Sequence, residues 1–177
     1  VILCVGQNPG TNHPRMLSTL EEAVSRGARL VAVNPLKEAG LLGFAHPQHL
    51  RGILGKATPL ASGYLQVKVN GDMALFRGVA KALVTMGAAD ETFIHGHGSG
   101  YEEYRSLLET TPWTEIEELS GIGRDAIEEL ALLLAEGEKR LITCWAMGLT
   151  QHRNAVATIR EIANVHLRDF KVRIIEG

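Results

Sequence analysis

The sequence of 177 residues carries a formal net charge of −2, with 45% hydrophobic and 21% charged residues. This is the balance of an ordinary globular protein, and it lacks the basic surplus that nucleic-acid binding favours, so we expect no nucleic-acid partner. No uninterrupted apolar run reaches ~18 residues, so we expect no membrane span.

The first part of the chain predicts a strand–helix–strand unit. Val1–Val5 is a short apolar run rich in β-branched residues, which favours a strand buried on both faces. A helix is predicted from Pro14 to Arg26, because proline suits the first helical position and Gly27 follows the predicted end. Arg29–Val33 is the second apolar strand, and the crossover between the two strands should be right-handed.

The next part of the chain predicts less regular structure. Residues 34–62 are expected to be mostly irregular, with a short helix at Pro47–Leu54. Tyr64–Val69 alternates apolar and polar residues, which suits a strand near the sheet edge. Asn70–Asp72 has the composition of a turn, and it should also cap a helix over Met73–Met86.

A mostly helical block is predicted at about residues 90–135, followed by one more strand. The helices of this block are expected at Asp90–His95, Tyr101–Leu108, Thr114–Leu119 and Arg124–Leu134. Leu141–Ala146 is predicted to be a buried strand. A loop is expected over Gly148–Asn154, and the last helix should begin near Asn154.

Strands that alternate with helices predict an α/β fold. We expect an open, mostly parallel sheet of about four or more strands with helices on both faces, a Rossmann-like three-layer αβα sandwich. The prediction is a single Rossmann-like domain over residues 1–177 that includes the helical block. In such sheets ligands bind outside the carboxyl ends of the strands. The segments after the predicted strands are rich in polar residues and glycine, and they are Gly6–His13, Asn34–Lys37, Asn70–Asp72 and Met147–Asn154. We therefore expect them to converge on one rim that binds a polar ligand.

The loop after the first strand suits a phosphorylated nucleotide better than NAD. Gly6 and Gly10 would let the backbone approach a ligand, and the following helix start offers amides to a phosphate. The third glycine of the dinucleotide fingerprint is missing, and Asn34 stands where an acidic residue would contact the ribose. Lys37 would add a cationic contact to a phosphate.

Asp72 is the most informative carboxylate, and two interpretations of it stay open. One carboxylate can accept both N–H donors on the edge of guanine. The alternative is that Asp72 only caps the helix that follows it, a role worth about 1 kcal/mol.

Histidine and cysteine give weak signals of their own. His95 and His97 lack a third metal ligand, so a solvated helix end is the favoured interpretation. Cys4 and Cys144 lie in apolar runs and are expected to be buried thiols in a reducing, cytoplasmic environment. No Cys-x-x-Cys motif occurs, so we expect neither an iron–sulfur cluster nor a structural zinc ion in this segment. We expect no catalytic residue and no metal ligand here.

Five motifs in order resemble the large subunits of molybdopterin-dependent oxidoreductases, the dimethyl sulfoxide reductase superfamily, and especially its formate dehydrogenase-like bacterial branch. The motifs are CVGQNPGTNHP at 4–14, GARLVAVNP at 27–35, NGDMAL at 70–75, GYEEYR at 100–105 and WAMGLTQH at 145–152. The resemblance extends from about Val1 to Asn164. The terminal residues 165–177 depart from the pattern, which expects a leucine-rich helix ending in Gly-Asn-x-Gly. Because the chain opens in an apolar run without Met, we expect a segment of a longer subunit.

The resemblance implies a function and a set of cofactor-binding residues. In that family such a domain binds one molybdopterin guanine dinucleotide and helps to position molybdenum or tungsten for two-electron oxidation of formate or a similar small substrate. The metal ligand and the catalytic residues lie outside the matching segment, so the isolated chain should be inactive, and its partners should be the remaining domains of the same subunit. The implied cofactor-binding residues are Gly6, Asn8, Pro9, Thr11, Asn12, His13, Asn34, Pro35, Lys37, Gly71, Asp72, Met147, Gly148, Gln151 and His152. For His13 and His152 a role within their own loops is an alternative. For the whole chain the alternative is a non-catalytic nucleotide-binding or interaction module on the same scaffold.

Overall fold

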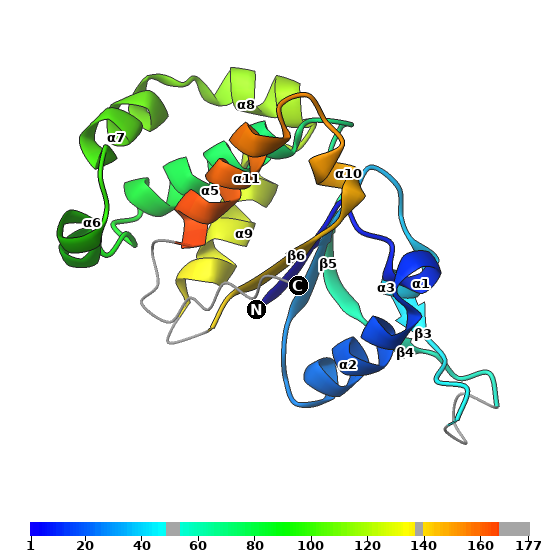
Figure 1. Cartoon of the computed structure of the whole chain (residues 1–177). Coiled ribbons are helices and arrows are strands. Elements are labelled where there is room, and N and C mark those ends of the chain that lie inside the picture. Colours follow the sequence, from blue (N-terminus) through cyan, green and yellow to red (C-terminus); the bar gives the residue numbers. More distant parts are fainter. Residues whose placement is uncertain (49–53, 137–139, 167–177) are drawn as a thin grey trace. The chain divides into compact units, whose positions relative to one another are not determined.

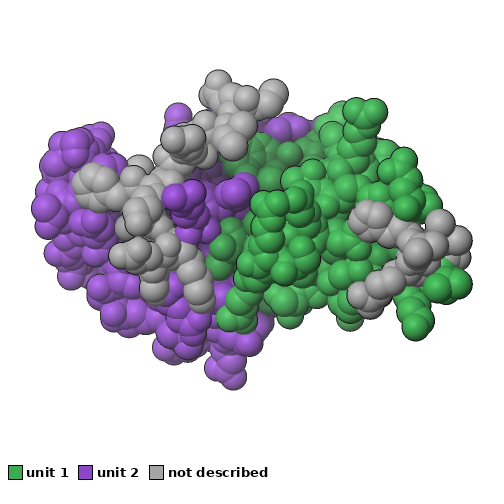
Figure 2. Space-filling view, turned by 90° about the horizontal axis from the view of Figure 1, so that it is seen from below, with its two compact units in different colours: residues 1–66, 143–148 green, residues 67–142, 149–177 purple. Residues whose placement is uncertain are grey.

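The computed structural model describes residues 1–48, 54–136 and 140–166 (Figure 1). The chain divides into two compact units, which Figure 2 distinguishes by colour. Unit 1 comprises residues 1–66 and 143–148, and unit 2 comprises residues 67–142 and 149–177. That the whole chain forms a single domain stays a prediction.

Unit 1 is built on a sheet with the strand order β5-β2-β1-β6. The strands are β1 (Ile2–Val5), β2 (Leu30–Val33), β5 (Ala61–Leu65) and β6 (Ile142–Trp145). β1 pairs in parallel with β2, and β2 pairs in parallel with β5. Every residue of β1 and β2 is buried, as continuous apolar strands at the centre of a parallel sheet require. The α/β class with a parallel sheet is confirmed.

Helix α2 (Pro14–Ser25) covers one face of this sheet. Leu17 and Leu20 pack with Ile2, Cys4 and Leu30 in one buried cluster. The alternating strand residues face this helix because successive side chains of a strand point to opposite faces. The helix begins at Pro14, as its sequence predicts, and ends one residue before the predicted Arg26.

Short elements occupy part of the segment that was expected to be mostly irregular. These are α1 (Pro9–Asn12), α3 (Ala39–Leu42) and an antiparallel pair formed by β3 (Gly43–Phe44) and β4 (Thr58–Pro59). Each is at most one turn or one pair of residues long, so hydrophobic periodicity could not reveal it. The short helix predicted at Pro47–Leu54 falls largely outside the described residues.

Unit 2 is helical, with α5 (Asp72–Thr85) packed against α7, α8, α9 and α11. The other helices are α6 (Glu91–His97), α7 (Tyr101–Thr110), α8 (Trp113–Ser120), α9 (Arg124–Ala135) and α11 (Ala155–His166). Gly78 lets α5 approach Ile116 and Ile127, because an added Cβ would lie 2.8 Å from an Ile116 methyl group. None of the helices among the described residues has both the length and the apolarity needed to span a membrane.

Three predicted elements differ from the structure. The strand expected at Tyr64–Val69 lies earlier, at Ala61–Leu65, because pairing with β2 rather than alternation sets its bounds. β6 was expected to be buried, but it ends the strand order, and Ile142 is 47% exposed. The loop expected from Gly148 instead begins with a helical turn, α10 (Met147–Thr150).

Candidate functional site

In unit 1 the segments that follow β1, β2 and β5 are joined by hydrogen bonds. The amide of Gly6 donates to the carbonyl of Val33 at 2.9 Å, and Asn34 Nδ2 donates to the carbonyl of Gln7 at 3.2 Å. The amide of Asn34 donates to the carbonyl of Leu65 at 3.1 Å. Gly6 has a φ of +59°, a left-handed conformation that favours glycine. The carboxyl ends of three strands therefore form one edge, here called the unit 1 rim (Gly6–His13, Asn34–Lys37, Gln66 and Met147–Gly148).

Hydrogen bonds of Asn8 hold the loop after β1 in its conformation, and part of the polar surface of the loop is exposed. Asn8 Oδ1 caps α1 by accepting from the amide of Thr11 at 3.1 Å, and Asn8 Nδ2 donates to Glu38 Oε2 at 2.5 Å. Pro9 is buried at the first position of α1. Thr11, Asn12 and His13 are exposed. Asn8 therefore shapes the loop, while the three exposed residues are accessible to a ligand.

The segment after β2 is braced by residues that the sequence did not single out. The carbonyl of Pro35 accepts from Gln66 Nε2 at 2.9 Å, and the amide of Glu38 donates to the hydroxyl of Tyr64 at 3.1 Å. The same hydroxyl donates to the carbonyl of Leu36. These contacts hold Pro35 and leave Lys37 exposed beside Leu36. The sequence did offer a signal for these contacts, because Tyr64 near the end of β5 and Gln66 just after it both carry polar groups.

Gln7 and Gly148 complete the unit 1 rim. Gln7 is 6% exposed, and its Oε1 is buried without a hydrogen-bond partner among the described residues. A Cβ added at Gly148 would lie 2.3 Å from the carbonyl oxygen of Gly6, so the two backbones meet in direct contact. Met147 is 63% exposed. Gln7 was missed because it lies in a loop sequence between Gly6 and Asn8, where nothing in the pattern marks one polar residue as buried.

In unit 2, Asp72 is a buried carboxylate at the first position of α5. It is 4% exposed, and its Oδ1 has no hydrogen-bond partner within the described part of the chain. Burial raises the pKa of Asp72, while its own backbone amide and the charge of His152 act in the opposite direction. The expectation that Asp72 caps α5 is wrong, because Gly71 occupies the capping position and Asp72 lies inside the helix.

The other predicted residues of unit 2 are Gly71, Gln151 and His152. Gly71 is closely surrounded, since an added Cβ would lie 2.7 Å from the carbonyl oxygen of Leu119. His152 is half-buried and close enough to affect the charge of Asp72, and Gln151 is exposed. Unit 2 thus contains a buried carboxylate with one unpartnered oxygen among the described residues, and the charge of His152 acts on it.

In the described part of the chain, the histidine pair of α6 and the two cysteines do not lie in a cluster of possible metal ligands. Across residues 1–48, 54–136 and 140–166 there is no group of three or more metal-ligating side chains. His95 and His97 are exposed at the end of α6. Cys4 and Cys144 are free thiols, and the pKa of Cys4 is raised to about 12, chiefly by burial and then by Cys144. Cys4 is buried, as expected, whereas Cys144 is only partly buried because it lies on β6 at the end of the strand order.

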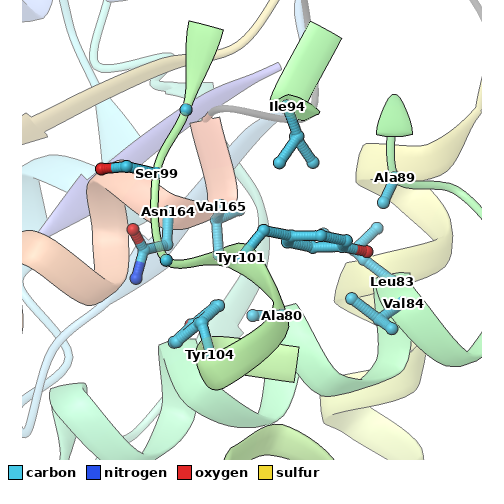
Figure 3. A pocket seen from close by; sticks show the side chains of 12 residues that line it. Ala80, Leu83, Val84, Ala89, Ile94, Ser99, Tyr101, Tyr104, Asn164 and Val165 are labelled. Carbon is cyan, nitrogen blue, oxygen red and sulfur yellow. The ribbon is translucent and has the colours of Figure 1, made fainter. Parts of the chain in front are cut away.

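A cavity of about 250 Å³ lies in unit 2 (Figure 3). Its walls are mostly apolar and come from α5, α6, α7 and α11, with Leu83, Ile94 and Val165 among them. Tyr101 and Tyr104 project from α7 into this region, and Asn164 approaches it from α11. None of the sequence-predicted site residues lines it.

The burial of Asp72 predicts a stability effect with a defined pH dependence. Its pKa is raised in the folded state, so the stability that it contributes is present at acidic pH and is lost as pH rises through the folded pKa. Asp72→Asn should therefore stabilise the unliganded protein at neutral pH, by on the order of 1 kcal/mol. Urea unfolding of both proteins from acidic to neutral pH should show a difference that grows with pH, and a pH-independent difference would contradict the expectation.

The sequence of this chain is similar to segments of known oxidoreductases. It is 42% identical over 173 residues to an uncharacterised oxidoreductase of Mycobacterium bovis, an alignment that covers 94% of this chain and 22% of that protein. It is 22% identical over 165 residues to formate dehydrogenase H of Escherichia coli, covering 93% of this chain and 21% of that enzyme. No protein-family model matches the chain. The chain thus spans about a fifth of the length of these relatives.

A solved structure shares the fold. Acetylene hydratase from Pelobacter acetylenicus superposes with a TM-score of 0.75 at 21% sequence identity, over 94% of this chain and 20% of that one. By sequence the chain is therefore similar to a segment of oxidoreductases, and it shares its fold with a segment of acetylene hydratase. More narrowly, the resemblance to the formate dehydrogenase-like molybdopterin oxidoreductases that the motifs indicate is confirmed.

Proposed function

We propose that this chain binds one molybdopterin guanine dinucleotide as part of a cytoplasmic, formate dehydrogenase-like oxidoreductase. The observation that carries the proposal is Asp72, a carboxylate that is 4% exposed and whose Oδ1 has no partner among the described residues. An unpaired buried acceptor is unfavourable unless a ligand satisfies it. The edge of guanine supplies two adjacent N–H donors, which match the two oxygens of a carboxylate.

Each unit supplies its own set of residues to the proposed role. In unit 1, the exposed Thr11, Asn12 and His13 and the cation of Lys37 would contact phosphates or ribose, while Asn8, Pro9, Asn34 and Pro35 shape the backbone around them. Met147 and Gly148 would approach the pterin end, and the backbone of Gly6 packs directly against Gly148 there. In unit 2, Asp72 would bind guanine, and Gly71, Gln151 and His152 would line the ligand.

The chain itself would bind and orient the cofactor, and it would take no chemical part in the reaction. The molybdenum or tungsten held by the pterin would supply the two-electron chemistry on formate or a similar small substrate. No catalytic residue and no metal ligand is proposed within the chain. The remaining domains of the same subunit would provide those groups and would be its partners.

Calorimetric titration of the chain with GMP and GDP, against AMP and NAD, tests the proposal. We expect guanine nucleotides to bind at least about tenfold more tightly than AMP, a difference of about 1.4 kcal/mol. Equal affinity for GMP and AMP would remove the support for guanine recognition. A clear preference for NAD would contradict the assignment.

A further inference from the structure

A buried ion-pair network in unit 2 joins three helices. Arg77 of α5 donates to Oε1 of Glu161 on α11 from Nε at 2.9 Å and from Nη2 at 2.6 Å. The hydroxyl of Tyr104 on α7 donates to the other oxygen, Oε2, at 2.5 Å. The side chain of Glu161 is 7% exposed and that of Arg77 is 21% exposed. Both oxygens of the buried carboxylate are therefore satisfied.

Stability alone is a weak explanation for this network. Removing two charges from water has a large desolvation cost, and well-packed apolar residues of similar volume are often as stabilising as a buried ion pair. The best-supported use of such pairs is to select one register between packed elements. Arg77 and Glu161 lie on two helices that pack against each other, so they can select the register of α5 and α11.

That register matters for the carboxylate of Asp72. Asp72 is the first residue of α5, and Arg77 lies roughly 8 Å farther along the same helix axis. His152 precedes α11 and acts electrostatically on Asp72, while Glu161 lies farther along α11. Asp72 and Arg77 thus lie on one helix, and Glu161 lies on the helix that packs against it, with His152 shortly before that helix. A shift of either helix would change the position of Asp72 relative to His152.

We propose that Arg77, Glu161 and Tyr104 are positioning residues, which hold Asp72 in place to bind the guanine edge. This inference rests on the proposed function and assigns a role to residues that do not themselves contact the ligand. Burial and the neighbouring Glu161 raise the pKa of Tyr104, so its hydroxyl stays protonated as a donor.

The test replaces the ion pair by apolar side chains of similar volume, Arg77→Met with Glu161→Met. In calorimetry the ratio of GMP to AMP affinity should fall about tenfold in this variant, while circular dichroism shows a folded protein. Tyr104→Phe, which removes one hydrogen bond, should lower the ratio less. The matched control is Glu22→Gln with Arg26→Gln, an exposed ion pair of α2 whose loss should leave the ratio unchanged. Should the double variant not fold, Arg77→Lys is measured instead, since it keeps the charge but loses the two-nitrogen geometry.

A second readout needs no nucleotide. The titration of the Asp72 carboxyl, followed by ¹³C NMR, should move toward the ordinary range of aspartate in the double variant, because a displaced carboxyl is better hydrated. An unchanged Asp72 titration together with an unchanged affinity ratio would overturn the positioning role. If the wild-type protein shows no guanine preference, the proposed function fails, and the NMR titration still decides whether the network positions Asp72.

Discussion

Replacing Asp72 with Ala should abolish the preference for guanine nucleotides over adenine nucleotides. The carboxylate is buried, and one of its oxygens lacks a partner in the described part of the chain, so a guanine edge would form charge-assisted hydrogen bonds there. Bonds of this kind are worth about 1.5–3 kcal/mol each, so we expect the affinity for GMP to fall roughly 10- to 100-fold or more. The affinity for AMP should change little, because adenine lacks the matching pair of donors. Calorimetry with both nucleotides on both proteins gives the ratio.

The control for this substitution is Asp125→Ala. Asp125 also lies in the first turn of a helix, α9, but it is exposed. Its loss removes a favourable interaction with the helix dipole without touching a buried carboxylate. If GMP affinity fell equally in the two variants, the cause would be the loss of a negative charge or of stability in general, and not the loss of a contact with guanine. A guanine preference that survives in Asp72→Ala would contradict the assigned role.

The stability and affinity effects of Asp72 should have opposite signs. Its burial makes the charged form unfavourable in the unliganded protein, as the raised pKa indicates. The same burial strengthens its hydrogen bonds to a bound guanine. A residue that lowers the stability of the free protein and raises its affinity for a ligand is characteristic of a binding site rather than of a structural cap. Measuring both the stability of Asp72→Asn and its affinity for GMP therefore distinguishes a binding site from a structural cap.

The sequence predicted the central strands because their signal is local. β1 and β2 are continuous apolar runs, and a strand at the centre of a parallel sheet needs that composition on both faces. The same reasoning overestimated the burial of β6, whose apolar run is similar but whose place at the end of the strand order leaves Ile142 exposed. Strand order depends on pairing between distant segments, which composition does not encode.

The rim was predictable in outline, while its internal contacts were not. Polar residues after β1 and β2 indicated a common edge, and the structure joins the two segments there by bonds from Gly6 to Val33 and from Asn34 to Gln7. The burial of Asp72 had no signature in sequence, because a helix cap and a ligand-binding carboxylate have the same local pattern. The pairing of Arg77 with Glu161 joins segments that lie far apart in the chain, and no spacing rule reaches that far.

Gly148→Ala should strongly destabilise unit 1 and disturb the rim, because the new Cβ has no space. It would lie 2.3 Å from the carbonyl oxygen and 2.9 Å from the carbonyl carbon of Gly6. These are backbone atoms, and Gly6 is held by its left-handed φ and by the bond from its amide to Val33. Relief therefore requires moving a strand end rather than a side chain, and overpacking of this kind costs about 1–3 kcal/mol or more.

Urea unfolding measures this cost, and Gly96→Ala is the matched control. Gly96 lies within α6 with no atom within 4 Å of an added Cβ, so alanine should leave stability unchanged or raise it by about 0.5–1 kcal/mol through helix propensity. The two identical substitutions should thus move stability in opposite directions. A Gly148→Ala protein as stable as the wild type would mean that the two backbones are not in contact, and the glycine pair would then lose its part in shaping the rim. Destabilisation confined to Gly148→Ala would show that the close approach of Gly6 and Gly148 holds the rim in place.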